Sequence, residues 1–194
     1  MKTFVFDNNC LKEKSPEIVS WYFLADSSLT NAGKPFFIPD FAEEFDAIPT
    51  IAIRINRLGK SISPKFAERY YSEFAAALHF RAADLLHRLH SLNLSPDPAT
   101  SFDRSFFMSE FMPLPPTGTP IVVKMKRNGE EVQELNTTNM RLSINDTIHH
   151  ASITNTLKIG DLIVPALPPG IKASIGDTFE LTWGEETPLM VQIK

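Results

Sequence analysis

Histidine is the residue type in this chain best suited to bind a transition metal or carry a proton, and three of the five histidines fall close together. His79, His87 and His90 lie in one stretch of the sequence. On a helix, His87 and His90 share a face because they are three residues apart, and imidazole is a common zinc ligand. A structural zinc site takes four ligands, and no fourth ligand is apparent here. We therefore favour solvated polar positions on an amphipathic helix over a metal site.

Two other groups invite a chemical interpretation. Cys10 has Lys12 nearby, and an ammonium group lowers the pKa of a thiol, but no histidine partner is close in sequence. We favour the interpretation that Cys10 is a small, half-buried side chain that only fills space in the packing. Glu43, Glu44 and Asp46 form an acidic run that either binds a cation or forms a solvated loop before a strand, and we favour the loop.

The elements that would position these residues are mostly strands. Ile51, Ile53 and Ile55 alternate with smaller or polar residues, which is the two-residue period of a strand with one buried face. Residues 121–126 and 131–135 flank the pair Asn128-Gly129, a sequence typical of a tight hairpin turn. The chain also repeats an apolar-Gly-Asp turn before two later strands, at residues 159–161 and 175–177.

Three helices are predicted in the middle and later parts of the chain. Ser63-Pro64 resembles a helix start, and it would place Phe66, Tyr70, Phe74 and Ala77 on one face. A second helix begins near Ala82, carries leucines at helical spacing, and stops before Pro96 and Pro98. A short third helix begins at Ser143, with Asp146 in its first turn.

Composition limits the possible classes of protein. The chain has 194 residues, 43% of them hydrophobic, and this suits a single domain spanning residues 1–194. A net charge of -4 with scattered basic residues argues against nucleic acid as a partner. No apolar stretch is long enough to span a bilayer, no signal peptide is recognisable, and the single cysteine suits a reducing compartment. We expect a cytoplasmic protein without a membrane partner.

Several segments together resemble a known family. They are residues 54–60 (Arg-Ile-Asn-Arg-Leu-Gly-Lys), 67–71, 101–103 (Ser-Phe-Asp), 128–130 (Asn-Gly-Glu), 136–140 and 157–161. In order and spacing they resemble the short, single-domain branch of the fumarylacetoacetate hydrolase family. The resemblance implies a mainly β (α+β) fold, in which a mixed β-sheet roll or barrel surrounds a central pocket and short helices lie outside. It also implies a homodimer.

The same resemblance implies a dismantled metal site. Members of the family hold Mg²⁺, Mn²⁺ or Ca²⁺ with carboxylates, and those positions correspond here to Ile48, Thr50 and His79. Hard cations need several oxygen ligands and charge compensation, so we expect no divalent cation and no other cofactor.

The catalytic positions of the family are also altered. The family histidine corresponds to Glu13, its arginine to Ala83, and two of its lysines to Ala25 and Thr100. A carbon–carbon bond hydrolase must stabilise enolate charge and deliver water, and these replacements remove the groups for both tasks. We therefore expect an inactive member of the family that serves as a binding or partner protein. The alternative is an enzyme with changed, metal-independent chemistry that acts on acylpyruvate-like or other keto acids bound in the central pocket.

Overall fold

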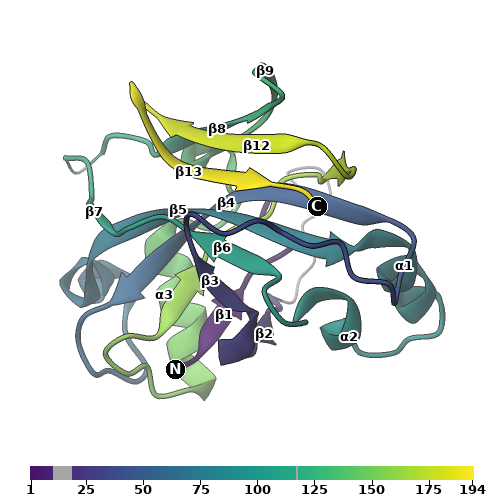
Figure 1. Cartoon of the computed structure of the whole chain (residues 1–194). Helices are drawn as coiled ribbons and strands as arrows, with labels where there is room; N and C mark the ends of the chain where they lie inside the picture. The colour runs from purple at the N-terminus through teal and green to yellow at the C-terminus, as the bar shows by residue number, and fades with distance from the viewer. Residues whose placement is uncertain (11–18, 117) are drawn as a thin grey trace.

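The computed structural model describes residues 1–10, 19–116 and 118–194, and most of its regular structure is β-strand (Figure 1). The larger sheet is formed by β1 (Thr3–Val5), β2 (Tyr22–Leu24), β3 (Leu29–Asn31), β4 (Phe45–Ile55), β5 (Tyr71–Ala82), β6 (Phe106–Met108), β7 (Met112–Pro113), β10 (Leu162–Val164) and β11 (Ile171–Ala173). The smaller sheet is formed by β8 (Val122–Arg127), β9 (Glu130–Asn136), β12 (Thr178–Trp183) and β13 (Glu186–Gln192).

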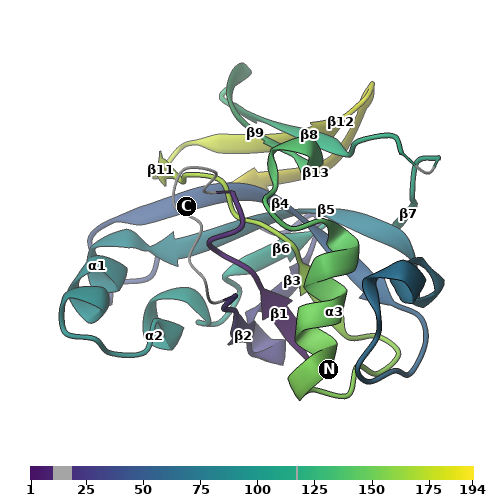
Figure 2. The ribbon, with the colours of Figure 1, turned by 180° about the vertical axis from the view of Figure 1, so that it is seen from behind.

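Short helices connect and flank the sheets. The α-helices are α1 (Ala83–Ser91), α2 (Asp97–Thr100) and α3 (Ile144–Thr154), and the 3₁₀ helices are η1 (Asp26–Ser28), η2 (Pro64–Tyr70) and η3 (Thr137–Asn139). Figure 2 shows α1 and α2 together near one end of the β4–β5 hairpin and α3 near the other. Within the described residues, none of these helices has the length and apolar character needed to cross a membrane.

The larger sheet is mixed and curls into a half-barrel. Its main path runs β2-β1-β10-β4-β5-β6-β3, with β1 parallel to β10 and β3 parallel to β6. The smaller, antiparallel sheet lies across the β4–β5 hairpin in Figure 1. This arrangement confirms the predicted mainly β fold of mixed sheets with short outer helices.

The β4–β5 hairpin divides the buried side chains into two sets. Ile51, Ile53 and Ile55 pack in the main core, as the alternating pattern predicted. The alternate positions belong to a second cluster, which fills the inside of the curl with apolar side chains from six strands and the segment after β10. Its buried members are Val5, Tyr22, Leu24, Ile48, Ala52, Ala75, Ala77, Phe106, Met108, Leu162, Val164 and Leu167. We call this set the interior cluster.

The predicted helix from Ser63 is wrong beyond its first residues. Ser63-Pro64 does begin a helix, but this is the 3₁₀ helix η2, and from Tyr71 the chain becomes β5. Phe74 and Ala77 therefore occupy opposite sides of a strand, one in the main core and the other in the interior cluster. Their helical spacing was overridden by long-range pairing, because β5 pairs with β4 along nearly its whole length.

The other local predictions agree with the structure. Asn128 and Gly129 have φ angles of 54° and 89° between β8 and β9, as the tight hairpin turn requires. Ser143 and Asp146 form a reciprocal capping box at the start of α3. In both apolar-Gly-Asp turns the aspartate accepts backbone N–H groups of its own turn, Lys158 N–H for Asp161 and Ser174 N–H for Asp177, and each turn precedes a strand.

Candidate functional site

Three positions that the resemblance assigns to metal ligands lie together on the inside of the curl. Ile48 on β4 is the cross-strand partner of His79 on β5, and Thr50 lies two residues further along β4. All three side chains are 0% exposed. The hairpin thus brings these positions to one face, as a shared site requires.

The side chains at these positions do not fit a divalent cation. Ile48 has no ligand atom and packs in the interior cluster. The Thr50 hydroxyl donates a hydrogen bond to the Ala166 carbonyl at 2.7 Å. Among the described residues, no group of three or more His, Cys, Asp or Glu side chains is arranged to hold a metal ion. A hard cation needs several anionic oxygen ligands, and these three side chains do not provide them.

His79 instead forms part of a buried hydrogen-bond chain. Its Nδ1–H donates to the Ser105 carbonyl at 3.1 Å, and its Nε2 lies 3.0 Å from the Tyr22 hydroxyl. Since a carbonyl only accepts, the neutral imidazole carries its proton on Nδ1, and Nε2 accepts from Tyr22. Burial lowers the pKa of His79 to about 3, and the charge of Arg81 adds to this effect. The ring is therefore neutral at physiological pH.

Arg81 is the cation at this end of the hairpin. It lies two residues beyond His79 on β5 and opposite Asp46 on β4, so its side chain projects from the same face as His79. Its charge acts on Asp7, Tyr22, Asp46 and His79. Its Nε is buried without a hydrogen-bond partner among the described residues.

A cleft of about 780 Å³ opens at the rim of the curl beside this cluster. We call it the rim cleft. It is lined by Asp7 after β1, by residues 20–25 around β2, by His90 of α1, and by residues 95–97 and 101 at α2. Tyr22 and Leu24 belong both to this lining and to the interior cluster. The open space nearest the predicted site thus lies at the rim of the curl, while the inside itself is packed.

The remaining predicted positions are divided around the rim cleft. Ala25 lines the cleft, and its N–H donates to the Ser101 hydroxyl at 2.8 Å. Thr100 is buried at the end of α2, next to Ser101. Ala83 begins α1, and its N–H donates to the Glu44 carbonyl at 2.8 Å. Glu13 lies outside the described residues.

The groups weighed as ligands from sequence alone do not come together. His79 is buried on β5, whereas His87 and His90 are exposed on α1. Burial raises the pKa of the half-buried Cys10 thiol to about 11, which opposes a nucleophilic role and agrees with a filler. Of the acidic run, Glu44 pairs with Lys172 at 2.8 Å and Asp46 lies in β4.

Asp7, Tyr22 and Arg81 were missed as candidate functional residues. No motif in the sequence marks Asp7 or Tyr22. The signal for Arg81 was its spacing, because residues two apart on a strand share a face. The prediction of a helix that includes Phe74 and Ala77 conceals this two-residue spacing.

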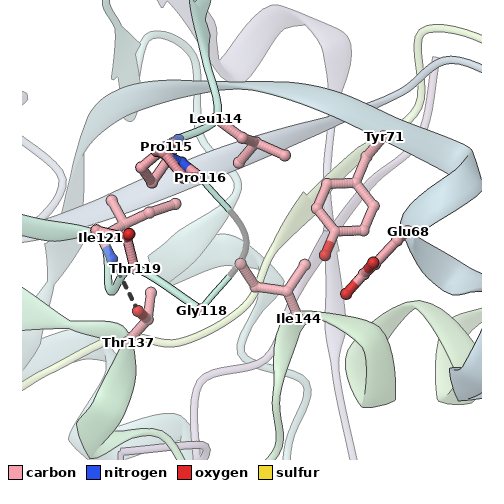
Figure 3. Close-up of a pocket in the computed structure, with 10 residues that line it drawn as sticks. All are labelled: Glu68, Tyr71, Leu114, Pro115, Pro116, Gly118, Thr119, Ile121, Thr137 and Ile144. Atoms are coloured by element: carbon pink, nitrogen blue, oxygen red, sulfur yellow. Dashed lines mark hydrogen bonds between the residues drawn. The ribbon is translucent and has the colours of Figure 1, made fainter.

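A second pocket, of about 260 Å³, lies between η2, α3 and the loop that precedes β8. Figure 3 shows Glu68 and Tyr71 across the space from Leu114 and the two prolines that follow it. The Tyr71 hydroxyl donates to Asn145 Oδ1 at 2.9 Å, and burial, aided by the charge of Glu68, raises its pKa to about 12. Glu68 is the charged side chain of this lining among the described residues, so the pocket does not favour an anionic ligand.

Comparison with known proteins identifies the family. The sequence profile described as "Fumarylacetoacetate (FAA) hydrolase C-terminal" matches residues 6–190, so the chain belongs to the fumarylacetoacetate hydrolase family.

Two curated relatives carry the same name. The chain is 29% identical over 143 residues to the mitochondrial oxaloacetate tautomerase FAHD1 of Rattus norvegicus, across 73% of this chain and 65% of that protein. It is 24% identical over 173 residues to the oxaloacetate tautomerase YcgM of Escherichia coli, across 87% of this chain and 78% of that protein. The match therefore spans slightly under two thirds of the length of the rat relative.

Solved structures show the same fold. A fumarylacetoacetate hydrolase family protein from Yersinia pestis superposes with a TM-score of 0.91 at 21% identity, covering 100% of this chain and 93% of that chain. The fumarylpyruvate hydrolase of Pseudomonas aeruginosa, solved in complex with Mn²⁺ and pyruvate, superposes with a TM-score of 0.90 at 18% identity, covering 100% and 89%. These likenesses establish the half-barrel fold.

Proposed function

We propose that this chain is an enzyme that acts on a small keto acid, of the oxaloacetate or acylpyruvate type, without a divalent cation. The observation that carries this proposal is the Tyr22–His79–Ser105 hydrogen-bond chain, with the Arg81 charge beside it, at the place where the resemblance puts a metal ligand. The names of the relatives support the class of substrate, since the rat and E. coli proteins are called oxaloacetate tautomerases.

The chemistry common to such substrates is an enolate, and the buried cluster supplies what an enolate needs. Negative charge develops on the substrate carbonyl oxygen when a proton leaves the neighbouring carbon, or when a neighbouring carbon–carbon bond breaks. Fixed dipoles and a cation in a site partly shielded from water stabilise that charge. The positive charge of the Arg81 guanidinium acts on Tyr22, and the Tyr22 hydroxyl is held by its hydrogen bond to His79 Nε2.

The experiment is turnover by protein freed of metal with a chelator. Ketonisation of the oxaloacetate enol is followed by loss of its ultraviolet absorbance, and pyruvate release from oxaloacetate or an acylpyruvate is followed on the same sample. We expect turnover that persists in the chelator. We also expect Arg81→Met to lower it strongly and Arg88→Met, an exposed arginine on α1, to leave it unchanged. Turnover that appears only after Mn²⁺ or Mg²⁺ is added would contradict metal-independent chemistry.

The second candidate function is a binding or partner protein that performs no reaction. The observation in its favour is that apolar side chains pack around Ile48 on the inside of the curl. A family member that needs a cation at this place would be inactive with these side chains. Absence of turnover for all of these substrates, with or without metal, combined with saturable binding of oxalate, would favour this candidate.

A further inference from the structure

The rim cleft contains one carboxylate that the sequence and the family resemblance leave without a role. Asp7 follows β1, whose end is fixed by the hydrogen bond from Phe6 N–H to the Val164 carbonyl at 3.0 Å. The side chain is half-buried, lines the cleft together with Tyr22, and takes part in no ion pair among the described residues. A carboxylate residue in the lining of a cleft can exchange a proton with a ligand bound there.

The charges around Asp7 come from three elements. Arg81 of β5 and His90 of α1 favour its ionised form, and Tyr22 of β2 lines the same cleft. Asp97 of α2 also lines the cleft, and it accepts a hydrogen bond from the Ser95 hydroxyl at 2.9 Å. Burial outweighs the effect of Arg81 and His90 and raises the pKa of Asp7 above that of an ordinary aspartate. Such a shift moves a carboxyl toward the range in which general bases work.

We propose that Asp7 is the catalytic acid–base residue of the rim cleft and moves a proton between carbon and oxygen of a bound small keto acid. This inference rests on the proposed function and adds to it the residue that touches the substrate. It also locates the reaction in the rim cleft, away from the packed inside of the curl.

The proton transfer balances without a co-reactant. Asp7 in its ionised form takes the proton from the carbon beside the keto group, and the electron pair of that C–H bond becomes the carbon–carbon double bond. The π electrons of the carbonyl group move onto its oxygen, which then takes the same proton from Asp7. The substrate leaves as its enol, Asp7 is again ionised, and the reverse sequence ketonises an enol.

Arg81 has a positioning role in this arrangement. Its charge acts on both Asp7 and Tyr22, which line the cleft, while Arg81 itself is not among the lining residues. It favours the ionised form of Asp7 between turnovers and places positive charge beside the oxygen on which the enolate charge develops.

The test compares Asp7→Asn, Asp7→Glu and the exposed control Asp40→Asn. Asparagine has the shape of aspartate but accepts no proton, so we expect kcat for enol ketonisation to fall by about a hundredfold or more. Binding of oxalate, measured by calorimetry, and the melting temperature should stay near those of the parent. Asp7→Glu should restore part of the rate, and Asp40→Asn should match the parent.

The pH profile separates this role from a structural one. A general base must be ionised, so kcat/KM of the parent should rise as the pH passes through the pKa of Asp7. That pKa lies above the pKa of an ordinary aspartate. The kcat/KM of Asp7→Asn should not show this rise. An Asp7→Asn variant that turns over like the parent overturns the assignment of Asp7 and leaves the proposed function standing. A parent that catalyses no keto–enol exchange overturns both.

Discussion

Introducing a carboxylate at Ile48 tests whether the inside of the curl is packed or open. Ile48 is fully buried against apolar neighbours, and its cross-strand partner His79 is held neutral. Full burial raises the pKa of a carboxyl by up to about 3 to 5, and a pKa change of one corresponds to about 1.36 kcal/mol. A carboxyl with a pKa above 7 stays protonated at pH 7, so the cost there is limited by the distance of about 2.7 between pH 7 and its ordinary pKa. Ile48→Glu should therefore lower the free energy of unfolding at pH 7 by about 3 to 4 kcal/mol, which is a large part of the stability of many domains.

The sign of the pH dependence follows from the direction of that pKa change. The glutamate has a higher pKa in the folded state than in the unfolded state, so the ionisation cost is absent below the unfolded pKa. It grows as the pH rises from the unfolded pKa to the folded pKa and is constant above the folded pKa. Urea unfolding at pH 5, 7 and 8 should show that the loss of unfolding free energy relative to the parent increases with pH in Ile48→Glu. In the conservative variant Ile48→Val this loss should be the same at each pH.

Ile159→Glu is the matched control, because Ile159 is 73% exposed and should show little loss at any pH. If Ile48→Glu were as stable as the parent at pH 8, this position would be open to solvent. The inside of the curl would then be a pocket, and the account of a packed interior would be refuted.

Metal binding, the Tyr22–His79 hydrogen bond and the oligomeric state can each be measured separately. Millimolar Mg²⁺ or Mn²⁺ should leave the melting temperature unchanged, whereas a cation at a hundred times its dissociation constant would add about 2.7 kcal/mol of stability and be visible by calorimetry. Tyr22→Phe leaves His79 Nε2 buried without its partner and should cost about 1 to 3 kcal/mol in urea unfolding; a smaller loss would mean that the hydrogen bond at 3.0 Å is unimportant. The chain should form a homodimer with an interface on the order of 1,200 Å² or more, and light scattering that gives the mass of one chain at micromolar concentration would refute this.

The sequence predicted most of the fold where local chemistry determines it. Asn128-Gly129 is suited to two positive φ angles, and Ser143 with Asp146 forms a cap through groups that are close in sequence. The resemblance, which depends on short segments in a fixed order, predicted the mixed sheets. These features need no knowledge of distant contacts.

The prediction failed where distant contacts decide the structure. Phe74 and Ala77 have helical spacing, yet β4 provides a pairing partner that no local pattern reveals. This error also concealed part of the candidate site, because on a helix Arg81 and His79 would point in different directions. Ile48, Thr50 and His79 were predicted to lie together, and the hairpin does place them on one face; their correspondence to metal ligands stays a prediction.

Metal-independent catalysis is tested by turnover of the oxaloacetate enol by protein whose metal content has been measured and shown to be negligible. We expect ketonisation faster than in buffer, unchanged by added Mn²⁺ and strongly reduced in Arg81→Met. Ketonisation that is absent from the metal-free protein and restored in proportion to bound Mn²⁺ would contradict metal-independent catalysis.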